Sequence, residues 1–210
     1  MLENIKCLGH STIKIENGEN IIYIDPYNIK EDIKDADAIF ITHNHYDHFS
    51  REDIIKIKNE NTIIVVTEDV YSSALELEFS DSQIIKVRPA ENYQLKNINF
   101  STIPAYNINK NFHPKENNWV GYILNINNVK YYIAGDTDIN EENKNVKCDV
   151  AFLPVGGTYT MDYKEAADLA NIIKPKIAVP IHYGIIVGTK EDALNFKKLI
   201  NKNIDCEIMY

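Results

Sequence analysis

Short apolar or alternating segments predict strands along most of the chain. Residues 12–16 alternate polar and apolar side chains, Asn17 and Gly18 favour a tight turn, and residues 21–24 continue as an apolar run. This pattern predicts a β-hairpin. Short apolar runs of this kind are typical of buried strands. The other segments that predict strands are 38–41, 62–67, 84–87, 98–103, 122–126, 129–133, 149–153, 177–181 and 204–209.

Helix signals are fewer than strand signals and fall in both halves of the chain. The side chains expected to cap helices are Ser50 (through Asp53), Asp162 (with Glu165 completing a capping box) and Thr189. A further helix is expected over residues 69–79, and Pro175 is expected to end the helix that Asp162 begins. Strands follow one another early and alternate with helices later. This order predicts two sheets packed together with helices outside.

Three of the apolar strands are each followed by a side chain that can bind a metal. The side chains that follow these strands within three residues are His43, Asp136 and His182. The end of a strand is a place where a rigid scaffold can hold a side chain on a loop at a fixed position. The sequence therefore predicts that chemistry is concentrated where these strands end.

Residues 43–48 carry the strongest chemical signal, because three of the six histidines lie there. In an extended backbone, residues i and i+2 point to the same side, so His43 and His45 can bind one ion together. Asp47 and His48 follow on the turn and can bind a second ion. Imidazole nitrogens and carboxylate oxygens are ligands that zinc, manganese, iron and nickel accept. A histidine-rich surface loop is the plainer alternative, but it would not need an apolar strand leading into it.

Composition narrows the class of protein. The 210 residues are 44% hydrophobic and 25% charged, which is typical of a globular protein and argues against a disordered chain or a membrane bundle. The formal net charge of −9 makes nucleic acid an unlikely partner, because proteins that bind it usually present a basic face. A small-molecule substrate is more compatible with this negative charge. The sequence leaves open whether the protein forms a homo-oligomer.

The first residues and the cysteines bear on location. The start of the chain lacks the basic segment and apolar stretch of a signal peptide, and the apolar runs are too short to cross a membrane. Three cysteines, Cys7, Cys148 and Cys206, are an odd number without close spacing, so they suggest reduced thiols. We expect a cytoplasmic protein that does not bind membranes.

The motifs, taken in order, resemble those of the metallo-β-lactamase superfamily. The segments that carry the resemblance are Thr42-His43-Asn44-His45-Tyr46-Asp47-His48, Gly135-Asp136-Thr137, Pro180-Ile181-His182-Tyr183-Gly184, Gly9-His10-Ser11 and Ile24-Asp25-Pro26. The first of them matches the pattern His-x-His-x-Asp-His. The resemblance covers nearly the whole chain, and it is strongest to compact, lactonase-like metal-dependent hydrolases.

This resemblance implies an α/β (α+β) fold, a four-layer αββα sandwich, formed by a single domain over residues 1–210. It implies a dinuclear site with two divalent metal ions, zinc first, with manganese, nickel or iron as alternatives. The ligands carried over are His43 and His45 for the first ion, Asp47, His48 and His182 for the second, and Asp136 as the bridge between them.

The resemblance also implies a reaction. A hydroxide between the two ions would attack an ester, a lactone or a similar bond of a small metabolite. Asp47 would give or take a proton. A phosphodiesterase using the same two-metal site is the first alternative, and a degenerate, metal-holding binding module is the second. A redox reaction at a di-iron centre is disfavoured. Members of the fold that catalyse one generally have an attached flavin domain, for which this chain is short, and acidic ligands in place of some histidines, whereas His48 is present here.

One departure from the family pattern concerns the first ion. The superfamily usually supplies a third histidine near the position of Tyr106, whereas the nearest histidine here is His113. His113 could bind the metal, contact substrate or move a proton, or serve the structure alone. If His113 contacts substrate instead of the metal, the first ion is left with a tyrosine, a water or weak occupancy. Tyr106 is a candidate supporting residue beside the site. His10 and Asp25 are candidate supporting residues, Asp25 by fixing the tautomer of an imidazole.

Overall fold

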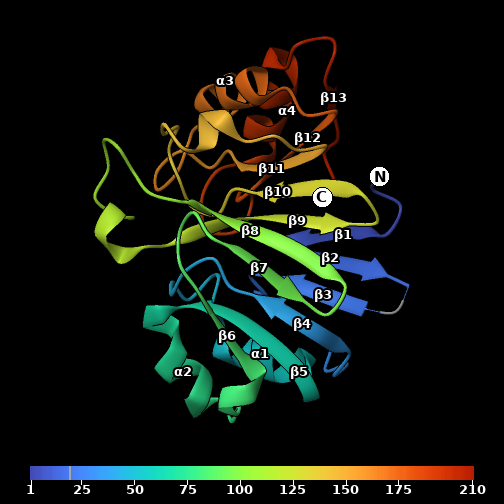
Figure 1. Cartoon of the computed structure of the whole chain (residues 1–210). Coiled ribbons are helices and arrows are strands. Elements are labelled where there is room, and N and C mark those ends of the chain that lie inside the picture. The colour runs from blue at the N-terminus through green and yellow to red at the C-terminus, as the bar shows by residue number, and fades with distance from the viewer. Residues whose placement is uncertain (19) are drawn as a thin grey trace. The chain divides into compact units, whose positions relative to one another are not determined.

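The computed structural model describes residues 1–18 and 20–210. The chain folds as two compact units, residues 1–88 and residues 89–210, and each is described by itself. Each unit contains one β-sheet and two α-helices, and Figure 1 shows the elements of both.

The sheet of the first unit has six strands in sequence order. They are β1 (Ile5–Gly9), β2 (Thr12–Asn17), β3 (Asn20–Ile24), β4 (Ala36–Phe40), β5 (Lys58–Thr67) and β6 (Ile84–Val87). The first three run antiparallel, and β3 to β6 run parallel to one another. The predicted hairpin is confirmed as β2–β3, in which Asn17 pairs with Asn20. Strand β1 was not among the predicted periodic segments.

Helices α1 (Arg51–Ile57) and α2 (Tyr71–Glu76) complete the first unit, together with one-turn 3₁₀ helices at Glu68–Val70 and Asp81–Gln83. Buried Ile54 of α1 and Ala74 of α2 belong to the same core as Ile39 and Ile64 of the sheet. The Ser50 cap is confirmed, since its side chain accepts the backbone N–H of Asp53. The helix expected over 69–79 ends earlier than predicted, and the left-handed backbone of Glu78 prevents its continuation.

The sheet of the second unit has seven strands, in the order β13-β12-β11-β10-β9-β8-β7. They are β7 (Asn92–Leu95), β8 (Ile98–Pro104), β9 (Val120–Ile126), β10 (Val129–Ile133), β11 (Val150–Pro154), β12 (Ile177–Ile181) and β13 (Asp205–Cys206). Strands β7 to β10 are antiparallel, and β10 to β13 are parallel. The strand expected over 204–209 is shorter than predicted, and β7 was not predicted.

Helices α3 (Tyr163–Ile173) and α4 (Lys190–Leu199) cover the parallel half of this sheet (Figure 1). Leu169 of α3 and Phe196 of α4 are fully buried in one core with Leu153 and Ala178 of the sheet. The predicted capping box of α3 is confirmed: Asp162 accepts from the backbone of Glu165, whose side chain accepts from the backbone of Asp162. Two further 3₁₀ turns are Lys115–Asn117 and Asn143–Asn145.

Several strands end in sharp turns that carry chemically active side chains. His10, Asp25 and His182 follow β1, β3 and β12, and all three have the positive φ angles of left-handed backbone, 52°, 46° and 59°. Such backbone costs about 1–3 kcal/mol for a residue other than glycine, and it is common at functional sites. Among the helices that the structure describes, none has the length and apolar character needed to cross a membrane.

Candidate metal centre

In the first unit, Asp25 is the centre of a buried hydrogen-bond network. Its Oδ1 accepts the backbone N–H of Thr42 at 2.8 Å, and its Oδ2 accepts the Thr42 hydroxyl at 2.7 Å. The same Oδ2 lies 2.8 Å from Nδ1 of His48. Since a carboxylate can only accept, it holds a proton on Nδ1 of His48, and the neutral ring then has its lone pair on Nε2. The turn after β3 thus orients an imidazole of the 43–48 motif.

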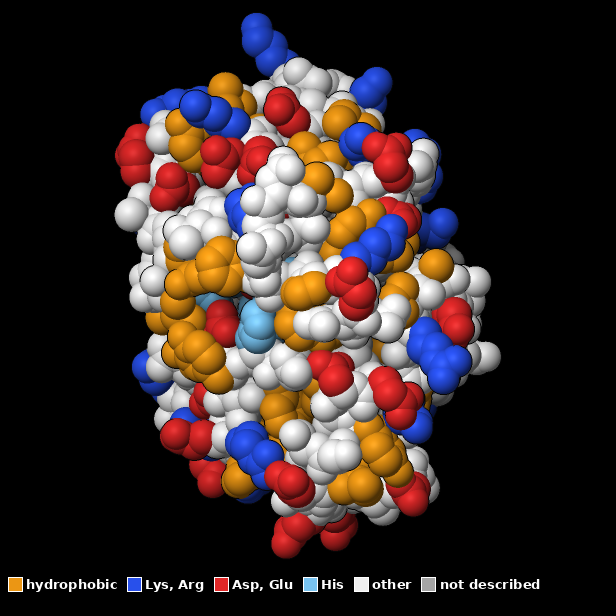
Figure 2. Space-filling model, turned by 90° about the vertical axis from the view of Figure 1, so that its left-hand side faces the viewer, with side chains coloured by type: hydrophobic (Ala, Val, Ile, Leu, Met, Phe, Trp, Pro, Cys, Tyr) orange, Lys and Arg blue, Asp and Glu red, His pale blue; other side chains and the backbone are white. Residues whose placement is uncertain are grey.

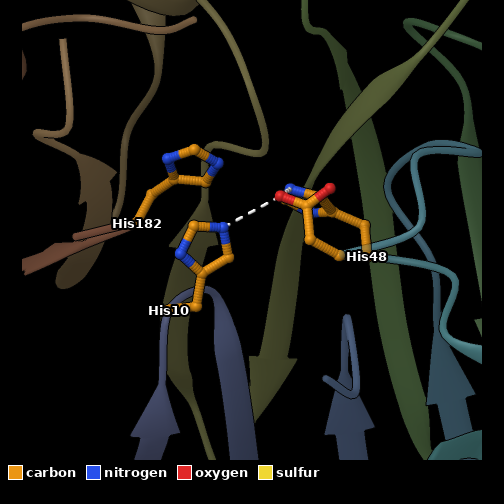
Figure 3. A group of neighbouring side chains, drawn as sticks. His10, His48 and His182 are labelled. Carbon is orange, nitrogen blue, oxygen red and sulfur yellow. Dashed lines mark hydrogen bonds and ion pairs between the residues drawn. The ribbon is translucent and has the colours of Figure 1, made fainter. Parts of the chain in front are cut away.

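Asp47 lies between two imidazoles of the first unit. Its Oδ2 is 2.9 Å from Nε2 of His10, an interaction drawn as the dashed line in Figure 3, and 3.6 Å from Nε2 of His48. Ligand atoms of the three residues lie within 4.8 Å of one another, and all three side chains are buried. The carboxylate of Asp47 and Nε2 of His48 are donors suited to a divalent metal, and His10 orients the carboxylate.

His43 and His45 form a second pair of donors in the same unit. Nε2 of His43 lies 3.0 Å from Nδ1 of His45, while Nδ1 of His43 lies 2.9 Å from the hydroxyl of Thr42. The turn is closed by backbone hydrogen bonds from His48 and Phe49 to the carbonyl of His45. The two rings therefore lie side by side, and their binding of one ion together stays a prediction.

Asp53 ties the start of α1 to the segment that follows Asp25. Its two carboxylate oxygens accept the backbone N–H groups of Asn28 and Ile29 at 2.7 and 2.9 Å. Burial raises the pKa of Asp53, but hydrogen bonds from Ser50, Lys56 and Asn28 outweigh it, so the net pKa lies below the ordinary value. The charged carboxylate therefore helps to hold this turn in place.

In the second unit, the carboxylate of Asp136 has an imidazole on either side. Its Oδ2 is 3.2 Å from Nε2 of His113 and 3.1 Å from Nε2 of His182. All three side chains are at least 96% buried. Asp136 comes from the loop after β10, His182 from the end of β12, and His113 from the long connection between β8 and β9. A buried charge of this kind needs cations or donors around it.

His182 is held in place by a close approach of the backbone at Gly156. A Cβ atom on residue 156 would overlap the carbonyl oxygen of His182 and lie 3.3 Å from its Nδ1. It would also lie 2.8 Å from a methyl group of Val187. Only glycine fits there, so the segment after β11 supports the His182 ring.

Tyr106 lies in a different set of contacts. Its hydroxyl donates to Oε2 of Glu142 at 2.7 Å and accepts from Nζ of Lys115 at 3.2 Å. Burial and the hydrogen bond to Glu142 raise the pKa of Tyr106 above its ordinary value, which keeps the phenol protonated at neutral pH. The hydroxyl is thus engaged by Glu142 and Lys115. Of the two candidates for the missing histidine's role, His113 is the one that reaches Asp136.

The donor set fits a divalent transition metal. Five of the six histidines are buried, the exception being half-buried His45. Accordingly, histidine atoms reach the surface in only a small area of the face shown in Figure 2. Buried imidazole and carboxylate donors, with rings oriented by other side chains, are the chemistry of zinc, manganese, iron and nickel sites.

Two side chains that support the donors were not singled out from the sequence. Thr42 joins Asp25 to His43, and Asn107 contacts Nδ1 of His113 at 3.0 Å. The sequence offers a signal for Thr42, which directly precedes the histidine motif. It offers none for Asn107, because this contact depends on the shape of a loop without periodicity.

Comparison with known proteins gives the family. The β-lactamase superfamily domain matches residues 4–182. A UPF0173 metal-dependent hydrolase of Pyrococcus abyssi is 31% identical over 212 residues, with 93% of this chain and 91% of that protein covered. The chain belongs to the metallo-β-lactamase superfamily. Its relatives are named metal-dependent hydrolases, so the enzyme class expected from the motifs is confirmed at the level of the family.

Solved structures agree with this superfamily assignment. A protein of Parabacteroides distasonis, provisionally described as a metal-dependent hydrolase, is 29% identical with a TM-score of 0.81, over 98% of this chain and 91% of that one. A Thermotoga maritima protein, provisionally described as a zinc-dependent hydrolase of the metallo-β-lactamase superfamily, has a TM-score of 0.66 at 20% identity, over 98% and 97% of the two chains. The predicted metallo-β-lactamase-like α/β fold is confirmed.

Proposed function

We propose that this superfamily member hydrolyses an ester, a lactone or a similar bond of a small metabolite with the help of two divalent metal ions, most simply zinc. The observation that carries the proposal is the Asp136 carboxylate oxygen at 3.1–3.2 Å from two buried imidazole nitrogens. A buried anion between imidazoles, on a chain whose relatives are named metal-dependent hydrolases, favours a metal centre over a structural ion pair.

The ligand assignment follows the motifs and the donors found within each unit. We propose that the first ion is held by His43, His45 and His113, with Asp136 shared between the ions. The second ion would take Asp47, His48 and His182. Support comes from the order of the motifs, which match the family pattern, and from the burial of most of these side chains.

The bound metal would supply a Lewis acid and a water of lowered pKa at neutral pH. The chain's own residues orient the ligands and exchange the proton. Asp25 holds the proton of His48 on Nδ1, and His10 holds Oδ2 of Asp47 by the contact at 2.9 Å. Oδ1 of Asp47 is then the atom proposed to exchange a proton with the reacting groups. His113 would act as a ligand and also contact the substrate.

Phosphodiester hydrolysis is the second candidate, because the same donors suit either kind of reacting centre. We further propose a cytoplasmic protein that acts on small molecules and does not bind nucleic acid. The net charge of −9 supports this, because a polyanion would meet repulsion.

The direct test is activity after metal exchange. Protein stripped with a chelator and reloaded with zinc or manganese is assayed on a panel of esters, lactones and phosphodiesters. Asp136→Asn should lower the metal-dependent rate by at least about 10²-fold. Asp168→Asn, the same change at an exposed position of α3, should leave it unaltered. Absence of metal-dependent turnover on the whole panel, or an active Asp136→Asn variant, would contradict the proposal.

A further inference from the structure

Asn107 makes four hydrogen bonds through its side-chain amide. Its Oδ1 accepts the backbone N–H of His113 at 3.0 Å and lies 3.0 Å from the ring Nδ1 of the same histidine. Its Nδ2 donates to Oδ1 of Asp138 at 3.2 Å and to the carbonyl of Tyr159 at 3.0 Å. Since Nδ2 faces two acceptors, the amide has only one favourable orientation, with its oxygen toward His113.

This orientation decides where the proton of His113 sits. An amide oxygen only accepts, so its partner at Nδ1 must carry hydrogen, and a neutral imidazole then has its lone pair on Nε2. On the other side of the ring, Oδ2 of Asp136 lies 3.2 Å from Nε2 and favours a proton there instead. Asn107 and Asp136 therefore favour opposite tautomers.

We propose that Asn107 is a positioning residue: it holds His113 in the Nδ1-protonated tautomer and thereby offers Nε2 to a metal ion. The inference rests on the proposed metal centre, but it concerns a residue outside the ligand set. Metal-binding histidines commonly donate their other ring N–H to such a partner, whose loss lowers metal affinity about 10–100-fold.

Asp138 keeps Asn107 in place. Besides the Asn107 amide, its carboxylate accepts the backbone N–H of Ile108 at 2.9 Å and the Nζ of Lys110 at 2.7 Å. The backbone N–H of Asn107 donates to the carbonyl of His113 at 2.8 Å, which closes the loop between the two residues. The amide is thus held from three sides before any metal binds, so the tautomer is set in advance.

The first experiment reads the tautomer in metal-free protein. Nitrogen-15 NMR distinguishes protonated from unprotonated ring nitrogens, at a pH about two units above the ordinary histidine pKa of about 6.5. The His113 signals are assigned with His113→Gln. Wild type should show the proton on Nδ1, and Asn107→Leu should move it to Nε2, beside Asp136. A proton on Nε2 in wild type, or an unchanged tautomer in Asn107→Leu, would overturn the proposal.

A matched double variant tests whether Asn107 acts by setting the tautomer of His113 or only by stabilising the loop between the two residues. Asn107→Asp combined with Asp138→Asn exchanges the amide and the carboxylate, so that an acceptor at residue 107 still faces His113 while the donor of the pair moves to residue 138. The carbonyl of Tyr159 loses its donor in this variant, as it does in Asn107→Leu. Zinc affinity, measured by competition with a chelator, should fall at least tenfold in Asn107→Leu and stay within about threefold of wild type in the double variant. Equal losses in both would show that the side chain only supports the loop.

Failure of this inference can be told apart from failure of the proposed function. If wild type binds no zinc, the metal centre is wrong, whatever the tautomer. If wild type binds zinc but the tautomer does not depend on Asn107, only the positioning role is wrong. Should Asn107→Leu fail to fold, the double variant still decides, because a proton on Nε2 there contradicts the proposal.

Discussion

Oδ2 of Asp25 lies 2.8 Å from Nδ1 of His48, and both side chains are completely buried. The same carboxylate accepts two hydrogen bonds from Thr42, so one residue fixes the start of the histidine motif and the orientation of its last ring. A buried imidazole held in this way has a defined tautomer before any metal arrives.

Asp25→Asn should therefore weaken metal binding more than it weakens the fold. An amide can replace only part of the carboxylate's accepting capacity, so His48 loses its fixed tautomer or Thr42 loses a partner. We expect zinc affinity to fall about 10–100-fold, measured by chelator competition. Circular dichroism serves as the control for folding, and an unchanged affinity in a folded variant would refute the role of Asp25.

Gly156→Ala should displace His182. The added methyl group would overlap the His182 carbonyl oxygen, and the side chain of Val187 stands on the other side. Overpacking of this kind costs about 1–3 kcal/mol of unfolding free energy, and metal affinity should fall with it. Gly18→Ala is the control for metal affinity: its left-handed backbone (φ 58°) also costs stability when a side chain is added, but among the residues that the structure describes no heavy atom lies within 4 Å of the new Cβ. Equal metal affinity in both variants would argue against this contact.

Tyr106→Phe and His113→Gln should differ sharply in metal binding. The Tyr106 hydroxyl contacts Glu142 and Lys115, whereas Nε2 of His113 faces Asp136. We expect Tyr106→Phe to leave zinc affinity unchanged and to cost about 1 kcal/mol of stability through the lost hydrogen bond. His113→Gln should lower affinity by at least the about 10–100-fold that is typical of losing an outer partner. The opposite order would make Tyr106 the donor.

Asp53 should make the free energy of unfolding depend on pH in the acidic range. Its pKa is lowered in the folded state, so the charged form stabilises the fold above the unfolded-state pKa, and this contribution is lost as pH falls through the lower folded value. Asp53→Asn should cost about 1–3 kcal/mol at pH 7, because donors such as Asn28 N–H lose a charged acceptor. In urea unfolding, the difference from wild type should shrink below about pH 4. A difference that is equal at both pH values would contradict this account.

Local pattern was enough to predict most strands and the proximity of His43 to His45. His43 and His45 follow an apolar strand at a spacing of two, and their relation depends only on the short turn that comes after the strand. Capping residues such as Ser50 and Asp162 act within one helical turn, so the helix starts were also readable. Short strands with polar residues, such as β7, lack this periodicity and were missed.

The contact between His113 and Asp136 was beyond the reach of local pattern. The two residues are far apart in sequence, and the connection that carries His113 is shaped by the amide of Asn107 and the carboxylate of Asp138. None of these bonds repeats with a period. The sequence could therefore name His113 as a candidate, while its position beside Asp136 had to come from three dimensions.

The most direct test of the account is an anomalous-scattering map from crystals of the protein grown with zinc. The account predicts two peaks, each with ligand atoms at about 2.0–2.2 Å, with the carboxylate of Asp136 touching both, His43 and His45 at one, and His48 and His182 at the other. A map without peaks at these side chains, or with zinc bound only by donors from one of the two units, would contradict it.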